Sequence, residues 1–238
     1  MKEDFTAGVK SALPVAIGYI PIAITFGLLA KDGGLSLYIT FLMSLMVFAG
    51  ASQFVALKLL GMGTGVSEII ITTFILNFRH FLMSASLARK VRDQVPKKWL
   101  ALLSFGITDE TFSVSSMQEG ELGPGYMLGL NFTSYLAWVG GSVLGFVVGA
   151  NLPGILQESM GIALYAMFIG LLVPAVKESR TNFIIVAITL GISSLFYYLS
   201  RYISVSEGWR IILVTVISAL IGTLLFQDDK QKEVIDDE

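Results

Sequence analysis

The sequence predicts an all-α protein, a polytopic transmembrane helical bundle of about seven to eight membrane segments. Two observations support this fold class. The chain is 54% hydrophobic with a mean hydropathy of +0.75, and only 14% of its 238 residues are charged, whereas soluble domains carry roughly 25%. Apolar runs long enough to cross a hydrocarbon core of about 30 Å also recur along the chain. The lipid bilayer is therefore the predicted environment of most of the protein.

Candidate membrane segments follow one another along the chain, each near the length of about 20 residues that a spanning helix needs. They cover residues 12–30, 37–60, 66–88, 98–117, 126–150, 158–176, 182–203 and 209–226. Polar or glycine-rich connectors separate them, such as KDGG at 31–34. We expect 1–226 to form a single transmembrane domain and the charged tail, 227–238, to be disordered.

The first segment is the strongest candidate for a broken or irregular helix. The stretch LPVAIGYIPIAITFG (13–27) contains Pro14 and Pro21, and Gly18 lies between them. Each proline lacks a backbone donor and disturbs a helix, and glycine adds backbone freedom. We therefore expect an interruption here.

The sequence also leaves open whether the chain contains an internal repeat. Residues 24–35 resemble 142–153, and residues 43–57 resemble 161–175, at about half the chain length. Apolar segments resemble one another easily, so chance similarity is the alternative to duplication. A true duplication is the architecture common in secondary transporters.

The loop RKVRDQVPKK (89–98) predicts the orientation. It contains five Lys or Arg residues against one Asp, and the positive-inside rule places such a loop in the cytoplasm. The next loop, with Glu119 and Glu121, then faces outward. Counting three spans back puts the N-terminus outside, unless one early segment enters and leaves the membrane on the same side.

Several classes of protein are excluded by composition. The chain has no Cys, so it lacks disulfides, a thiolate nucleophile, and cysteine-based zinc or iron–sulfur sites. A net charge of −2 provides no basic face for nucleic acid. We predict no metal ion, no cofactor and no nucleic-acid partner. Ser52 and His80 could be read as a nucleophile and its base, but this pairing is a weak signal, and we predict that the chain is not an enzyme.

Polar residues interrupt the apolar stretch FILNFRHFLMSASL (74–87), which contains Asn77, Arg79 and the single histidine, His80. An Arg at mid-membrane costs roughly 2.5–3.5 kcal/mol on insertion scales, so it usually faces protein or water. On a helix Asn77 and His80 lie within about 60° of each other, while Arg79 points roughly 100° from His80. Either Arg79 contacts a different neighbour, or the helix is interrupted here.

Asp109 and Glu110, in FGITDETFS (105–113), are the predicted counter-charges for Arg79. One interpretation is purely structural, with an ion pair that holds two helices together. The other is functional, with at least one of these groups contacting substrate or carrying a coupling proton. His80 could relay a proton near neutral pH or be a hydrogen-bonded core residue.

Smaller polar groups complete the set of candidate site residues. Along the fourth segment a polar stripe comprises Ser104, Thr108, Thr111 and Ser115. Ser52 and Gln53, in VFAGASQFVAL (47–57), lie among small residues, and Gln53 offers both a donor and an acceptor. Asn131, in GLNFTSYLAW (129–138), is a similar group in the second half. Helix packing is the alternative role for all of them.

Five stretches together resemble the AzlC family, the large subunit of the branched-chain amino acid exporters called LIV-E. They are ALPVAIGYIPIAITFGLLA (12–30), SLMVFAGASQFVALKLL (44–60), LNFRHFLMSASLA (76–88), TDETFS (108–113) and GLNFTSYLAWVGGSVLG (129–145). The resemblance covers nearly the whole chain up to about residue 226. The acidic tail lies outside it.

The resemblance implies a transporter domain in a prokaryotic cell membrane. It implies a partner, a small AzlD-type membrane subunit, and export of valine, leucine, isoleucine or analogues. A zwitterionic substrate needs groups for its carboxylate and its ammonium. Arg79 or a broken helix end could meet the first, and Asp109 or Glu110 the second. No phosphate-binding loop of the ATPase type is present, so transport is predicted to be secondary. The alternative is a non-transporting membrane scaffold or a channel subunit.

Overall fold

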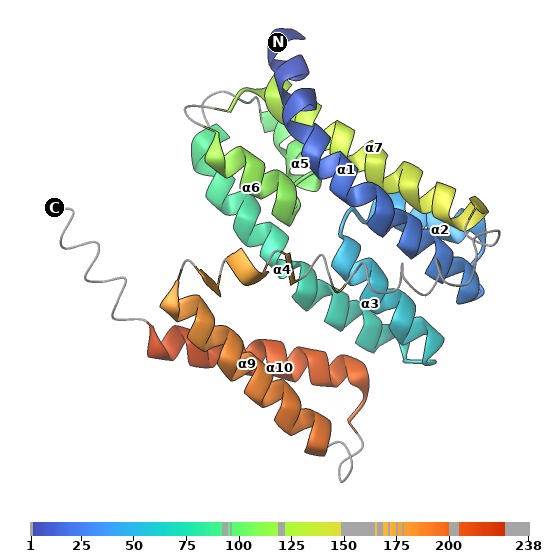
Figure 1. Cartoon of the computed structure of the whole chain (residues 1–238), viewed down its shortest axis with the longest axis vertical. Coiled ribbons are helices and arrows are strands. Elements are labelled where there is room, and N and C mark those ends of the chain that lie inside the picture. Colours follow the sequence, from blue (N-terminus) through green and yellow to red (C-terminus); the bar gives the residue numbers. More distant parts are fainter. Residues whose placement is uncertain are drawn as a thin grey trace, which may run out of the picture. The chain divides into compact units, whose positions relative to one another are not determined.

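The computed structural model describes residues 2–91, 95, 97–118, 122–148, 165, 169–170, 172–174, 176–177, 179–199 and 205–226. Every secondary-structure element in these ranges is an α-helix, which confirms the predicted fold class (Figure 1). The chain divides into two compact units. The first comprises Met1–Gly61 and Thr73–Tyr165, and the second comprises Met62–Thr72 and Ala166–Glu238.

Five of the described helices are long and apolar enough to cross a membrane, namely Glu3–Asp32, Val66–Ala88, Pro124–Val148, Arg180–Leu199 and Glu207–Leu225. They agree with five of the predicted segments. The predicted segment 158–176, its repeat stretch 161–175 and the tail 227–238 lie largely or wholly outside the described residues. The basic loop 89–98 is described only in part, so its cytoplasmic orientation stays a prediction.

Helix α1 (Lys2–Asp32) is uninterrupted, so the expected irregularity at 13–27 was wrong. Pro14 and Pro21 both lie inside it. A proline inside a helix leaves a carbonyl one turn earlier without its donor, but nearby Ser or Thr side chains and neighbouring helices can compensate in membrane helices. The carbonyls freed in this way are those of Lys10 and Ile17, four residues before each proline. Thr25 makes a separate bond, in which its hydroxyl donates to the carbonyl of Pro21 over 2.9 Å. The helix ends in a Schellman turn, in which Gly34 has φ +79° and the Leu35 amide donates to the Ala30 carbonyl.

The predicted segment 37–60 is in fact two short helices, α2 (Leu37–Met46) and α3 (Gly50–Gly61). Ser36 caps α2 by accepting a hydrogen bond from the Ile39 amide. The helix stops where Val47 adopts an extended conformation. Neither piece reaches the roughly 20 residues that a straight span requires. We call residues 47–49 the first break.

The predicted segment 98–117 is likewise divided, into α5 (Lys97–Phe105) and α6 (Asp109–Met117). Thr108 caps α6, and its side chain and that of Thr111 form a reciprocal capping box. We call residues 106–108 the second break. The proposed stripe of Ser104, Thr108, Thr111 and Ser115 on one helix was therefore wrong, because Ser104 belongs to α5 and the other three to the cap and body of α6.

Helix α4 (Val66–Val91) is continuous, which rules out the alternative of an interruption at 77–80. Helix α7 (Pro124–Val148) is also long and begins with proline at its first position, where the missing amide costs nothing. A buried apolar core in the first unit joins α1, α4, α5 and α7. It includes Ala12, Leu87, Leu103 and Leu130.

Helices α1 and α7 lie side by side in direct backbone contact (Figure 1). At both ends of the contact, a Cβ atom added to a glycine of one helix would overlap main-chain atoms of the other. The glycines concerned are Gly8, Gly27, Gly129 and Gly145. Small residues that bring backbones together are typical of helix pairs in membranes.

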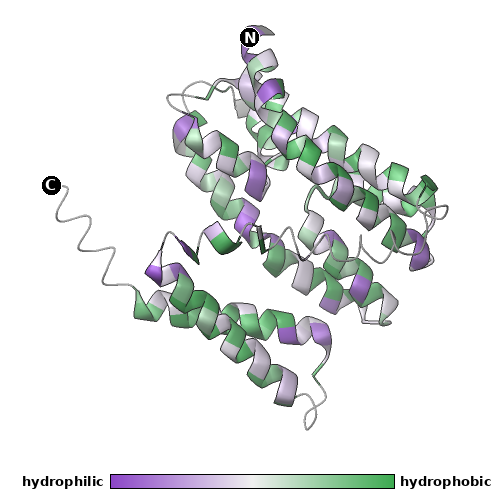
Figure 2. Cartoon of the chain, in the orientation of Figure 1, coloured by the Kyte–Doolittle hydropathy of each residue, from purple (hydrophilic) through white to green (hydrophobic). Residues whose placement is uncertain are grey.

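In the second unit, α9 (Arg180–Leu199) and α10 (Glu207–Leu225) pack against each other, and both are predominantly hydrophobic (Figure 2). The start of α4 belongs to this unit and supplies Glu68. The Glu68 carboxylate accepts hydrogen bonds from the Ser206 hydroxyl and from the Trp209 amide. A carboxylate here compensates the positive end of the α10 dipole.

Candidate functional site

Arg79, on α4, forms an ion pair with Asp109, the first residue of α6. The Arg79 Nη1 and Asp109 Oδ2 atoms are 2.8 Å apart, and the side chains are 37% and 31% exposed. The Nε atom of Arg79 is buried and has no hydrogen-bond partner in the described part of the chain. The guanidinium therefore has donor capacity that Asp109 leaves unused.

Glu110, the next residue, is held by a different helix. The Tyr19 hydroxyl, from α1, donates to Glu110 Oε2 over 2.5 Å and lies 2.6 Å from Thr108 Oγ1. A phenol has one proton, and here it goes to the carboxylate, so the Thr108 hydroxyl must donate to the Tyr19 oxygen. Adjacent residues on a helix point about 100° apart, which explains why Asp109 and Glu110 reach different partners.

The ring of Tyr19 extends this site to the first break. It packs edge to face against Phe48, with centroids 6.0 Å apart, and against Trp138, with centroids 5.5 Å apart. Phe48 is in the first break, and Trp138 lies against Gly50, where an added Cβ would be 2.6 Å from the indole Cη2. One buried aromatic cluster thus contacts both breaks.

Gln53, a predicted site residue, is fully buried in a hydrogen-bond network around the start of α3. Its Nε2 donates to Ser44 Oγ over 3.1 Å, and its Oε1 accepts from Trp138 Nε1 over 2.7 Å. Ser44 in turn donates to Ser142, which donates to the Trp138 carbonyl. The network ties α2, α3 and α7 together at the first break.

Asn131 and Ser52 bind main-chain carbonyls beside the two breaks. Asn131 Nδ2 donates to the carbonyl of Leu103, in the last turn of α5, over 2.9 Å. An added Cβ on Gly106 would be 2.5 Å from that nitrogen, so the amide fits only against a glycine. Ser52 Oγ donates to the Ala49 carbonyl over 2.9 Å. Both side chains are therefore committed to holding the broken backbone.

His80 and Asn77 lie on the same helix as Arg79. His80 follows Arg79 directly in the chain and is half-buried. The Oδ1 atoms of Asn77 and Asn131 are buried without a hydrogen-bond partner among the described residues. Buried polar atoms of this kind usually have a partner.

The structure therefore sorts the predicted site residues into two groups. Arg79 pairs with Asp109, and His80 and Glu110 are the sequence neighbours of these two residues, whereas Ser52, Gln53 and Asn131 hold the breaks through bonds within the protein. The sequence reasoning missed Tyr19 and Trp138. The available signal was their chemistry alone, because a buried Tyr or Trp in a membrane segment needs a partner for its polar atom.

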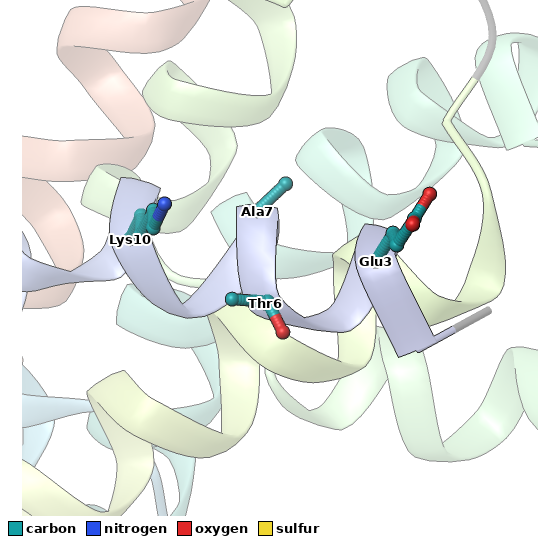
Figure 3. A pocket seen from close by; sticks show the side chains of 4 residues that line it. All are labelled: Glu3, Thr6, Ala7 and Lys10. Carbon is teal, nitrogen blue, oxygen red and sulfur yellow. The ribbon is translucent and has the colours of Figure 1, made fainter.

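A separate hollow lies on the N-terminal part of α1. Glu3, Thr6, Ala7 and Lys10 line it, as Figure 3 shows, and its volume is about 570 Å³. Lys10 precedes Tyr19 by nine residues, which is roughly 13 Å along a helix axis. This hollow is distinct from the cluster at the breaks.

Comparison with known proteins connects this arrangement to a family. Residues 14–152 match the family described as AzlC protein. The chain is 36% identical to an uncharacterized membrane protein of Archaeoglobus fulgidus over 93% of each chain. It is 31% identical to the inner membrane protein YgaZ of Escherichia coli, over 74% of this chain and 75% of that one.

A third relative is the branched-chain amino acid transport protein AzlC of Bacillus subtilis, which is 24% identical over 92% of this chain and 84% of the relative. No solved structure matches. Together with the five candidate spans, these relatives identify a multi-pass membrane protein, and the family supports a role in membrane transport.

Proposed function

The chain belongs to the AzlC family, and from this membership we propose that it is the large subunit of a secondary transporter that exports branched-chain amino acids with a small AzlD-type partner. The name of the Bacillus subtilis relative supports the substrate class. The partner follows from the family resemblance. Valine, leucine and isoleucine are the substrates to test first.

One observation carries the proposal: a cation and two carboxylates meet beside a helix break within the spanning part of the chain. Arg79 has guanidinium donors left over from its bond to Asp109, and these suit a substrate carboxylate. Glu110 is half-buried and is held by a neutral hydroxyl rather than a cation, so it suits an ammonium group. Broken helices that expose polar groups at mid-membrane are typical of secondary transporters.

An efflux assay in cells tests the proposed substrate, the need for the partner and the direction of transport in one experiment. Cells that make the chain, with and without the small partner, are loaded with a panel of labelled amino acids. We expect saturable efflux of branched-chain amino acids only when both proteins are present. In reconstituted vesicles, counter-substrate should stimulate flux. A channel would show neither saturation nor this stimulation, and a scaffold would show no flux.

Arg79→Ala should abolish efflux while the protein stays in the membrane. The matched control is Arg210→Ala, because Arg210 also forms an ion pair, with Glu207 of α10 at 3.6 Å, but lies in the second unit. The control should export at the parental rate. Normal efflux by the Arg79 variant would contradict the proposed site.

A further inference from the structure

Tyr19 contacts both helix breaks of the first unit. Its hydroxyl is bonded at the second break, to the Thr108 cap and to Glu110 in the first turn of α6. Its ring packs against Phe48 of the first break. Tyr19 is only 5% exposed and comes from the uninterrupted helix α1. Any movement of the Tyr19 side chain therefore changes contacts at both breaks.

The two adjacent carboxylates are compensated differently. Asp109 faces a full positive charge on Arg79 at 2.8 Å, whereas Glu110 receives the uncharged phenol of Tyr19. A hydroxyl donor stabilises a carboxylate without cancelling its charge. Because Glu110 is also partly exposed, a cation that reaches the site can bind Glu110 without displacing an arginine.

Resting on the proposed function, we propose that Tyr19 is a positioning residue that links Glu110 to the first break, so that a cation bound at Glu110 alters the packing at residues 47–49. The cation is the substrate ammonium group or a proton. A proton converts Glu110 to a neutral acid, so the charge-assisted bond from Tyr19 becomes an ordinary one of about half the strength. An ammonium group leaves Glu110 ionised but donates to the same carboxylate, so it competes with the Tyr19 hydroxyl for the acceptor oxygens. The phenol then keeps only the bond to Thr108 at full strength, and its ring can shift against Phe48 and Trp138.

The chain has no cysteine, so a single cysteine introduced at the first break is the only thiol that a labelling reagent can modify. Ala49 lies in the first break and is 4% exposed, so a cysteine in the Ala49→Cys variant reports local opening through its rate of reaction with a membrane-permeant maleimide. Tyr19→Phe removes only the hydroxyl, and Glu110→Gln removes only the charge. Tyr19→Phe should raise the labelling rate by about tenfold or more, the range set by losing a hydrogen bond to a charged group. Glu110→Gln only weakens that bond, so it should raise the rate by a smaller factor, about three- to tenfold.

The decisive measurement is the labelling rate of the double variant, Tyr19→Phe with Glu110→Gln, compared with the rates of the two single variants. If Tyr19 acts through Glu110, the double variant should label no faster than Tyr19→Phe alone. Independent effects that multiply, or labelling rates that neither substitution changes, would overturn the proposal. Tyr135→Phe is the matched control, because the Tyr135 hydroxyl donates to the Leu45 carbonyl at 2.6 Å and its ring also contacts Phe48. Its effect should multiply with that of Glu110→Gln.

The effect of added leucine on the labelling rate distinguishes a failure of this proposal from a failure of the proposed function. In the Ala49→Cys protein, leucine should change the labelling rate at least about twofold, and Tyr19→Phe should remove that response. If leucine has no effect on labelling or efflux but Tyr19 and Glu110 remain coupled, the assigned substrate is wrong and the link stands. If leucine acts and the two substitutions are independent, the link is wrong and the transport proposal stands.

Discussion

Replacing Asp109 by Asn removes the charge that compensates Arg79 and keeps the shape of the side chain. Exposed ion pairs contribute about 0.2–1 kcal/mol, and removing one partner of a buried pair costs about 3–5 kcal/mol. With side chains 37% and 31% exposed, the expected cost lies between these limits, at about 1–3 kcal/mol. For a chain of this size each kcal/mol lowers Tm by about 2–4 °C. Thermal unfolding in detergent should therefore show a Tm lower by about 2–12 °C.

The double variant Arg79→Gln with Asp109→Asn separates stability from transport. It removes both charges, so no unpaired guanidinium remains, and most of the lost Tm should return. Leucine efflux should be absent in the double variant, because the substrate carboxylate has lost its cation. Efflux at the parental rate in the stable double variant would refute the functional reading of Arg79 and leave a purely structural ion pair.

Three further substitutions, one of them with a matched control, test the packing. Gly145→Ala forces a Cβ into the main chain of Ile24 and should cost about 1–3 kcal/mol in thermal unfolding, whereas Gly140→Ala, with open space around it, should not destabilise. Glu68→Ala removes the acceptor at the N-terminus of α10 and should cost about 1 kcal/mol, seen as a lower Tm. Gln53→Leu leaves a buried indole N–H without its acceptor and should cost about 1–3 kcal/mol, with no Tm change contradicting the network.

The second break could have been predicted from the sequence. Thr108 followed by Asp109 and Glu110 is a typical helix start, with a capping hydroxyl and acidic residues in the first turn. Gly106 just before it permits the close approach of Asn131. A hydropathy average over about 20 residues includes this break along with the helices on both sides of it. Segment length alone therefore predicts one span where the structure has α5 and α6.

The first break has no comparable local signal. Val47, Phe48 and Ala49 are apolar residues that suit a spanning helix, and no side chain of the capping type precedes Gly50. The break is held by residues distant in sequence, above all Tyr19 and Trp138, which only the folded chain brings there. Conversely, the prolines of α1 are strong local signals of a helix break, yet the helix continues through both of them.

The backbone contact between α1 and α7 determines which parts of the first unit can yield. At glycines such as Gly27 and Gly145 no side chain separates the two main chains, so sliding one helix along the other would bring the Cβ atoms of neighbouring residues against main-chain atoms. We therefore expect α1 and α7 to move together as one rigid body. The short helices α2, α3 and α5 meet this pair through side chains of α7, since Tyr135 bonds the Leu45 carbonyl, Trp138 lies against Gly50 and Asn131 bonds the Leu103 carbonyl. If the proposed transport function holds, we therefore expect the movements it needs to occur in the short helices rather than between α1 and α7.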